Sequence, residues 1–74
     1  MKYTIDLHNL IEHEAISKIE MAILTFNDTD EYDELEIITG NGEVLKDVTI
    51  DILSDNNLDY EFLNNGCILV KKYD

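Results

Sequence analysis

Hydrophobic and polar positions alternate along this chain with two different periods, each typical of one kind of secondary structure. Residues 3–7 follow a period of two, which predicts a strand that turns one set of side chains inward. Over residues 12–26 apolar side chains recur at steps of three and four, the stripe of an amphipathic helix. We expect this helix to cross one face of the sheet. The inward strand positions are Tyr3, Ile5 and Leu7, and the helical stripe consists of Ala15, Ile16, Ile19, Ala22, Ile23 and Phe26.

The second half of the chain repeats this order of strand and helix and then adds two further strands. Residues 35–39 form a short apolar run with β-branched side chains, which predicts a strand covered on both faces. The sequence GNG at residues 40–42 ends this strand, and Asn65 and Gly66 predict the tight turn of a hairpin. The remaining elements are expected as a helix over residues 43–54, a strand over 58–62 and a strand over 67–73.

The predicted order of elements is strand, helix, strand, helix, strand, strand, which defines an α/β fold. Connections of the strand-helix-strand type are right-handed and bring their strands parallel. The first three strands are therefore expected to run largely parallel, and the hairpin makes the fourth antiparallel to the third. We predict a single domain over residues 1–74, with a four-stranded mixed sheet and two helices.

The balance of charge is strongly acidic, with 17 Asp and Glu residues against 5 Lys and Arg residues and a formal net charge of −12. Nucleic-acid binding usually depends on positive side chains that neutralise phosphates, so this surface disfavours it. Six acids gather in residues 27–36, where we expect a solvated connector. A calcium-binding loop does not fit this stretch, because Asp33 stands where glycine is needed and Thr39 stands where a carboxylate is needed.

The single cysteine and the hydropathy of the chain disfavour a disulfide-rich, zinc-binding or membrane protein. Cys67 has no second cysteine for an internal disulfide and is a poor start for a zinc site, so we expect a packed strand residue. No apolar run approaches the roughly 18 residues of a membrane span. The N-terminus lacks the apolar middle region of a signal peptide. We expect a cytoplasmic protein with no membrane partner.

Asp6 and His8 are the first candidates for chemistry, because they stand at the end of the predicted first strand, one residue apart. Sites in such sheets gather at the carboxyl ends of the strands. A carboxylate can hold an imidazole in one tautomer and favour its protonated form, which suits general acid–base chemistry. A histidine in this place also serves as a helix-capping or packing residue, and the sequence leaves that alternative open. His13, between two glutamates in the first helix, is interpreted as a solvated surface residue.

A second candidate follows the strand over residues 35–39. Gly40 and Gly42 flank Asn41 just before the second predicted helix, where backbone N–H groups and the helix dipole can bind an anion such as phosphate. Glycines also occur simply to turn a chain from strand to helix, which is the alternative. Because both candidate segments follow parallel strands, we expect them to be neighbours at one edge of the sheet.

Three stretches together resemble the Smr (small MutS-related) domain across essentially the whole chain: IDLHNLIEHEA, EIITGNGEVLKDV and YEFLNNGCILVKK. The first matches the Asp-x-His motif of that family and the Glu-Ala of the helix that follows. The second matches its glycine motif in the form Thr-Gly-x-Gly, and the third matches its closing hairpin. The matching residues are Ile5, Asp6, Leu7, His8, Glu14, Ala15, Thr39, Gly40, Asn41, Gly42, Gly66, Ile68, Leu69 and Val70.

The resemblance implies a two-layer α/β sandwich, similar to the C-terminal domain of translation initiation factor three. It also implies association with DNA or RNA and, in several members, a nicking endonuclease activity. By the same resemblance, Asp6 and His8 become the candidate catalytic acid–base pair. Mg²⁺ or Mn²⁺ is an optional cofactor of such a reaction. The candidate phosphate- or nucleic-acid-binding residues are Thr39, Gly40, Asn41, Gly42 and Lys46.

The chain departs from the family in ways that remove positive charge. Many members carry Lys in the glycine loop and Arg at the start of the second helix, whereas this chain has Asn41 and Glu43 there and only Lys46 near the place of the Arg. Asn9 replaces a glycine of the first motif. This replacement is tolerated where φ must be positive, because Asn is among the residues that adopt that conformation. Ile11 replaces a helix-capping threonine and offers no oxygen to the first-turn amides.

Two functions therefore remain open. The first is a nicking endonuclease domain, for example the C-terminal module of a MutS-like ATPase in DNA repair, in recombination or on the ribosome. A tethered nuclease tolerates weak binding of its own, because the tether raises its effective concentration. The alternative is a catalytically inactive, acidic module that docks on a basic protein or a ribosomal partner. The sequence also leaves open the oligomeric state and whether the chain is full-length or an excised domain.

Overall fold

The structure is a computed structural model that describes residues 1–72, and it contains the six predicted elements in the predicted order. The observed boundaries lie within two residues of the predicted ones. The predicted end of the last strand at Tyr73 lies outside the described residues. The elements are β1 (Lys2–Asp6), α1 (Glu12–Asp28), β2 (Glu34–Ile38), α2 (Glu43–Asp55), β3 (Tyr60–Asn64) and β4 (Cys67–Lys71).

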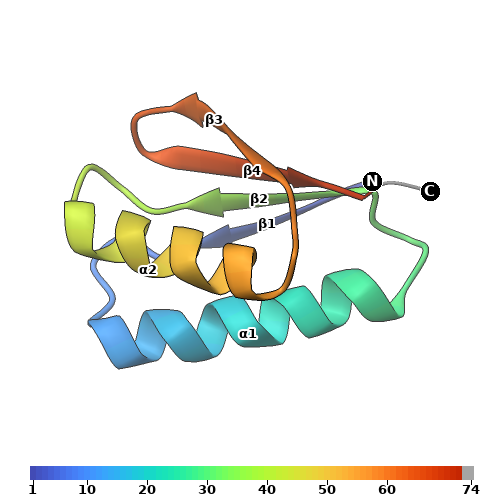
Figure 1. Cartoon of the computed structure of the whole chain (residues 1–74), viewed down its shortest axis with the longest axis horizontal. Helices are drawn as coiled ribbons and strands as arrows, with labels where there is room; N and C mark the ends of the chain where they lie inside the picture. Colours follow the sequence, from blue (N-terminus) through green and yellow to red (C-terminus); the bar gives the residue numbers. More distant parts are fainter. Residues whose placement is uncertain (73–74) are drawn as a thin grey trace.

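The four strands form one mixed sheet in the order β1-β2-β4-β3 (Figure 1). β1 pairs with β2 in parallel, and β4 is antiparallel to both of its neighbours. The first three strands therefore point in the same direction, as predicted. The sequence pattern does not reveal that β4 lies between β2 and β3. This insertion brings the β3–β4 turn next to the end of β2.

Both helices lie on the same side of the sheet, which makes a two-layer sandwich (Figure 1). On the covered face the paired residues Ile5, Ile37 and Ile68 form a buried row. On the opposite face Glu36 is only half-buried. The expectation that residues 35–39 are covered on both faces is therefore wrong, because the two helices of the described chain share one face.

The helix α1 packs its predicted apolar stripe into the core, with Ile16 half-buried and the other five positions buried. At its N-terminus Ile11 provides no side-chain cap, as expected from its chemistry. The carboxylate of Glu14 instead accepts a hydrogen bond from the backbone N–H of Ile11 at 3.3 Å, which is one half of a capping box. His13 is exposed, as predicted. Within residues 1–72 neither helix is both long and apolar enough to cross a membrane.

The helix α2 has a more polar buried stripe than α1. Its buried residues are Lys46, Thr49 and Leu53. The hydroxyl of Thr49 donates to the carbonyl of Leu45 at 2.7 Å, so this buried oxygen is satisfied within the helix. The buried lysine lies at the N-terminal turn of the helix and contributes to the candidate site.

Cys67 is a buried, free cysteine of β4, which confirms the predicted packed strand residue. Its thiol donates to the carboxylate of Glu36 at 2.9 Å. Burial, reinforced by this neighbouring carboxylate, raises the pKa of Cys67 to about 11. The side chain is therefore a neutral thiol at physiological pH and a weak nucleophile.

The acidic connector before β2 joins the two ends of the described chain. The N–H of Asp33 donates to the carbonyl of Met1 at 3.0 Å, and the carbonyl of Asp33 accepts the N–H of Lys72 at 3.0 Å. The amino group of Met1 also lies 3.2 Å from the Asp33 carboxylate. Figure 1 shows the start of β1 and the end of β4 at the same end of the sheet.

Replacing Phe26 by leucine is expected to lower the free energy of unfolding by about 1–2 kcal/mol, because Phe26 is the largest fully buried side chain and leucine leaves a cavity. Urea unfolding followed by circular dichroism measures the change. Met21→Ala is the matched control on the same helix, since Met21 is 65% exposed, and it is expected to cost less than about 0.5 kcal/mol. Equal losses in the two variants would contradict the core position of Phe26.

Candidate functional site

Three connections gather at one end of the sheet: β1 to α1, β2 to α2, and the β3–β4 turn (Figure 1). The paired residues Asp6, Ile38 and Cys67 stand in one row across this edge. The expectation that the two candidate segments are neighbours is therefore confirmed. The β3–β4 turn is a third segment that the sequence reasoning did not include.

Asp6 and His8 form a hydrogen-bonded pair. One oxygen of the Asp6 carboxylate accepts the backbone N–H of His8 at 3.0 Å and lies 2.5 Å from Nδ1 of the ring. The bonds from the His8 side chain and backbone lower the pKa of Asp6 below its ordinary value. Because an ionised carboxylate can only accept, Nδ1 carries a hydrogen and the neutral ring keeps its lone pair on Nε2. About half of each side chain is exposed, 56% for His8 and 48% for Asp6, so water and substrates can reach the pair.

The backbone after His8 is held in a tight turn. Asn9 adopts φ of +71°, the left-handed conformation that the replacement of glycine by Asn predicts. The N–H of Leu10 donates to the carbonyl of Leu7 at 3.1 Å, and the N–H of Leu7 donates to the carbonyl of Ile38 at 2.7 Å. Leu7 itself is fully buried. The position of His8 is thus fixed by its neighbour Leu7, whose backbone is hydrogen-bonded to β2 and whose side chain packs in the core.

Two glycines allow the three segments to come together. Gly40 has φ of +76°, and a Cβ atom at this position would lie 3.2 Å from the Cβ of His8. A Cβ atom on Gly66 would in turn lie 3.1 Å from the carbonyl oxygen of Gly40. His8, Gly40 and Gly66 are therefore packed so closely that a side chain on either glycine would displace its neighbour by a few tenths of an ångström.

The first part of the glycine loop is used within the protein. The carbonyl of Gly66 accepts the N–H groups of Thr39 at 2.9 Å and Gly40 at 3.2 Å. Thr39 is only 2% exposed, and its hydroxyl donates to the carbonyl of Gly40 at 3.1 Å. These two predicted phosphate-facing residues therefore fix the shape of the loop.

The second part of the loop faces solvent. Asn41 and Gly42 are exposed, and Gly42 is the N-cap of α2 with no side-chain cap. The first N–H groups of an α-helix have no acceptor within the helix, so the amides from Gly42 onward are suited to bind an anion. Of the predicted loop residues, Asn41 and Gly42 are the two that are exposed.

Lys46 lies close to this loop, but its ammonium group is already engaged. Its Nζ donates to the side-chain oxygen of Asn65 in the β3–β4 turn at 2.9 Å and lies 3.7 Å from the carboxylate of Glu43. The side chain is only 10% exposed. Lys46 therefore connects α2 to the β3–β4 turn, and its positive charge is largely buried beneath the loop.

Lys18 belongs to the site although the sequence reasoning did not select it. Its Nζ donates to the backbone carbonyl of Asp6 at 3.3 Å, and its charge also favours the ionised form of the Asp6 carboxyl group. Lys18 stands one helical turn after Glu14, so helical periodicity could have found it once α1 was placed beside the end of β1.

Within residues 1–72 the donor side chains do not form a metal site made of protein groups alone. In the part of the chain that the structure describes, no three His, Cys, Asp or Glu side chains come together in a way that could hold a metal ion. Asp6 and His8 are two donors, and one oxygen of Asp6 already accepts two hydrogen bonds. Mg²⁺ or Mn²⁺ would need further ligands from substrate and water.

The comparisons with known proteins find similarity in structure only. No model of a known protein family matches the chain, and no curated protein matches it. A crystal structure of the human small-MutS related domain is similar over 93% of this chain and 99% of that domain, with 24% identity and a TM-score of 0.73. The solution structure of the SMR domain of NEDD4-binding protein 2 is similar over 100% of this chain and 88% of that domain, with 22% identity and a TM-score of 0.74.

These observations define the class of fold first. An open, four-stranded mixed sheet with two helices on one face is the two-layer α/β sandwich that the resemblance to Smr domains implies. The order of elements and the two similar structures then specify it further: the chain has the Smr fold. The Smr fold that the sequence motifs suggested is therefore confirmed by the structure.

Replacing Gly40 by alanine is expected to destabilise the protein by about 1–3 kcal/mol, because alanine is strained at positive φ and its methyl group would press on His8. Gly42→Ala is the matched control, since Gly42 has negative φ and open space around it. Its expected loss is below about 1 kcal/mol. Thermal unfolding by circular dichroism compares the two, and a smaller loss in Gly40→Ala than in Gly42→Ala would refute the close packing at His8.

The carboxyl group of Asp6 is expected to titrate below its ordinary pKa of 3.8. A lowered pKa in the folded state means that this group contributes stability above pH 3.8, and the contribution is lost as the pH falls through the folded pKa. NMR of the carboxyl carbon measures the midpoint, which should rise towards 3.8 in His8→Ala. His13→Ala is the control and should leave the midpoint unchanged; an unchanged midpoint in His8→Ala would be evidence against the pair.

Proposed function

We propose that this chain is a nucleic-acid-processing domain in which Asp6 and His8 hydrolyse a phosphodiester bond, as a nicking endonuclease does. The observation that carries the proposal is the hydrogen-bonded Asp6–His8 pair in contact range of Gly40, whose loop leads directly to the exposed N-terminus of α2. This arrangement combines a proton-transfer group with an anion site. The resemblance of the motifs to Smr domains supports DNA or RNA as the substrate class.

In the proposed reaction, Nε2 of His8 removes a proton from a water molecule whose oxygen attacks the phosphorus atom. A P–O bond to the water oxygen forms, and the P–O bond to the leaving sugar oxygen breaks. The imidazolium then gives its proton to the leaving oxygen, so that a phosphate and a hydroxyl remain at the nick. Asp6 orients the ring and stabilises the imidazolium. The amides from Asn41 to Glu43 are suited to donate to the non-bridging oxygens.

The net charge of the chain affects how strongly such a site would bind nucleic acid. Lys18 and Lys46 lie at the site, but the chain as a whole has a formal net charge of −12. Repulsion of the polyanion makes independent binding weak and sensitive to salt. We therefore propose that a larger protein brings this domain to nucleic acid, since a tether raises the local concentration of the phosphate.

A plasmid-nicking assay tests the proposal at low salt, with EDTA, Mg²⁺ or Mn²⁺ in separate reactions. His8→Ala is expected to reduce the nicking rate by about 100-fold or more, because it removes the proton-transfer group. Asp6→Asn is expected to reduce it by about 10-fold or more, because it weakens the orientation of the ring. His13→Ala is the matched control, an exposed histidine on α1 whose removal should leave the rate unchanged.

Two outcomes would overturn the catalytic role. Equal nicking by the wild type and His8→Ala would identify a contaminating nuclease. No nicking by the wild type, also when it is fused to a DNA-binding domain that supplies affinity, would leave the acidic docking module as the better function. Nicking in the presence of EDTA would in addition show that the reaction needs no divalent metal ion.

A further inference from the structure

The edge strand β3 exposes more apolar surface than any other strand of the described chain. Its side chains are exposed from Glu61 to Asn64, and Tyr60 is half-buried. Phe62 is 49% exposed and Leu63 is 47% exposed. Within residues 1–72 these are the two large apolar strand residues that reach solvent to this extent. An edge strand also carries backbone N–H and C=O groups that no neighbouring strand pairs.

The opposite edge strand, β1, exposes no large apolar side chain. The ring of Tyr3 stacks on Tyr32 at a centroid distance of 5.0 Å, and Ile5 is buried. Lys18 donates to the carbonyl of Asp6 at the end of this strand. The contrast shows that exposure of β3 is not a general property of the edges of this sheet.

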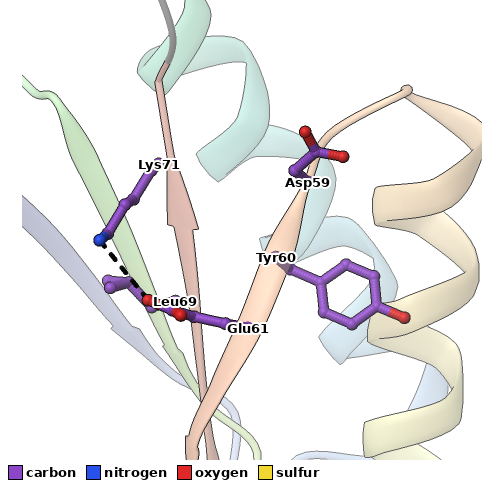
Figure 2. Close-up of a pocket in the computed structure, with 5 residues that line it drawn as sticks. All are labelled: Asp59, Tyr60, Glu61, Leu69 and Lys71. Atoms are coloured by element: carbon purple, nitrogen blue, oxygen red, sulfur yellow. Dashed lines mark ion pairs between the residues drawn. The ribbon is translucent and has the colours of Figure 1, made fainter.

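The two faces of β3 differ in chemistry. Figure 2 shows Tyr60 turned towards α2, whereas Glu61 lies on the other face beside Leu69 and Lys71. The ring of Phe62 meets Tyr60 edge-to-face at 6.1 Å, so the face towards the helices is aromatic. On the open face Glu61 lies 3.6 Å from Lys71 and lines a small hollow with Asp59. Up to the register shift between Phe62 and Asn64, a strand paired here would place alternate side chains against aromatic rings and against carboxylates.

Charge selects the kind of strand that fits. Asp59 and Glu61 flank Tyr60 at this edge, with Lys71 3.6 Å from Glu61, and elsewhere on the domain α2 presents four exposed acids at four-residue steps. A second copy of this chain would carry the same formal net charge of −12, and repulsion between the two copies opposes self-association. A segment with positive side chains is instead attracted by the net negative charge of the domain and by Asp59 at this edge. The four acids of α2 are Glu43, Asp47, Asp51 and Asp55.

We propose that the outer edge of β3 is a docking site for an extended, basic segment of a partner protein, which adds to the sheet as a fifth strand. Backbone hydrogen bonds to β3 provide affinity, while lysine or arginine beside Asp59 and Glu61, alternating with apolar residues beside Tyr60 and Phe62, provides specificity. The site uses residues other than Asp6 and His8, so it does not depend on the proposed hydrolysis. The proposal names the surface on which the basic partner suggested by the acidic composition would bind, and the kind of peptide that would bind there.

Fluorescence anisotropy at low salt tests this proposal with a short labelled peptide in which lysine alternates with valine. The double substitution Phe62→Ser, Leu63→Ser is expected to weaken binding about 10-fold or more. Leu24→Ser is the matched control, because Leu24 is 60% exposed on α1 and its loss should leave binding unchanged. His8→Ala should also bind normally, which separates docking from hydrolysis. Circular dichroism establishes that each variant is folded.

Changes in the peptide test the mode of binding without any risk to the fold. Methylation of alternate backbone nitrogens removes peptide donors and should abolish binding, and glutamate in place of lysine should do the same. Equal binding of either altered peptide, or an unaffected Phe62→Ser, Leu63→Ser variant, would overturn the proposal, as would no binding by the wild type. A dimer in sedimentation that Phe62→Ser, Leu63→Ser dissociates would identify a second copy of the chain as the occupant instead.

Discussion

The contact of His8 with Gly40, and of Gly40 with Gly66, is the constraint on which the rest of the site depends. Each glycine lies where a Cβ atom would come within about 3.2 Å of its neighbour, so three segments meet through backbone surfaces. The contact is possible because β4 enters the sheet beside β2 and carries Gly66 to the end of that strand. The orientation of His8, the shape of the glycine loop and the hairpin turn are therefore parts of a single packing arrangement.

Sequence periodicity predicted the elements well, because apolar repeats of two and of three to four residues reflect local geometry. The edge shared by Asp6, His8 and the glycine loop also followed from the direction of parallel strands. The insertion of β4 was not predictable in this way, since a hairpin is local but its place in a sheet depends on distant contacts. For the same reason, the burial of Thr39 and the use of the Gly40 amide by Gly66 are visible only in the structure.

The positive charges of this chain are paired with groups of the protein itself. Each of the five lysines has a partner within the described chain, a carboxylate, an amide or carbonyl oxygen, or an aromatic ring. The lysines therefore neutralise or bridge neighbouring groups of the protein, while most of the acids face solvent. Such a surface repels phosphates at long range and attracts basic segments. The partners are Glu36 for Lys2, Asp6 for Lys18, Asn65 and Glu43 for Lys46, Glu61 for Lys71, and Thr29 and Phe26 for Lys72.

The junction at Asp33 has a mechanical consequence. Met1 and Lys72 are bonded to opposite sides of this one residue, and β1 and β4 run antiparallel on either side of β2. Tension applied between these two ends would act across the strands, and inter-strand hydrogen bonds loaded in this direction open one after another. The sheet would then peel from the end that lies farthest from His8, so the glycine contacts would be among the last to separate under load.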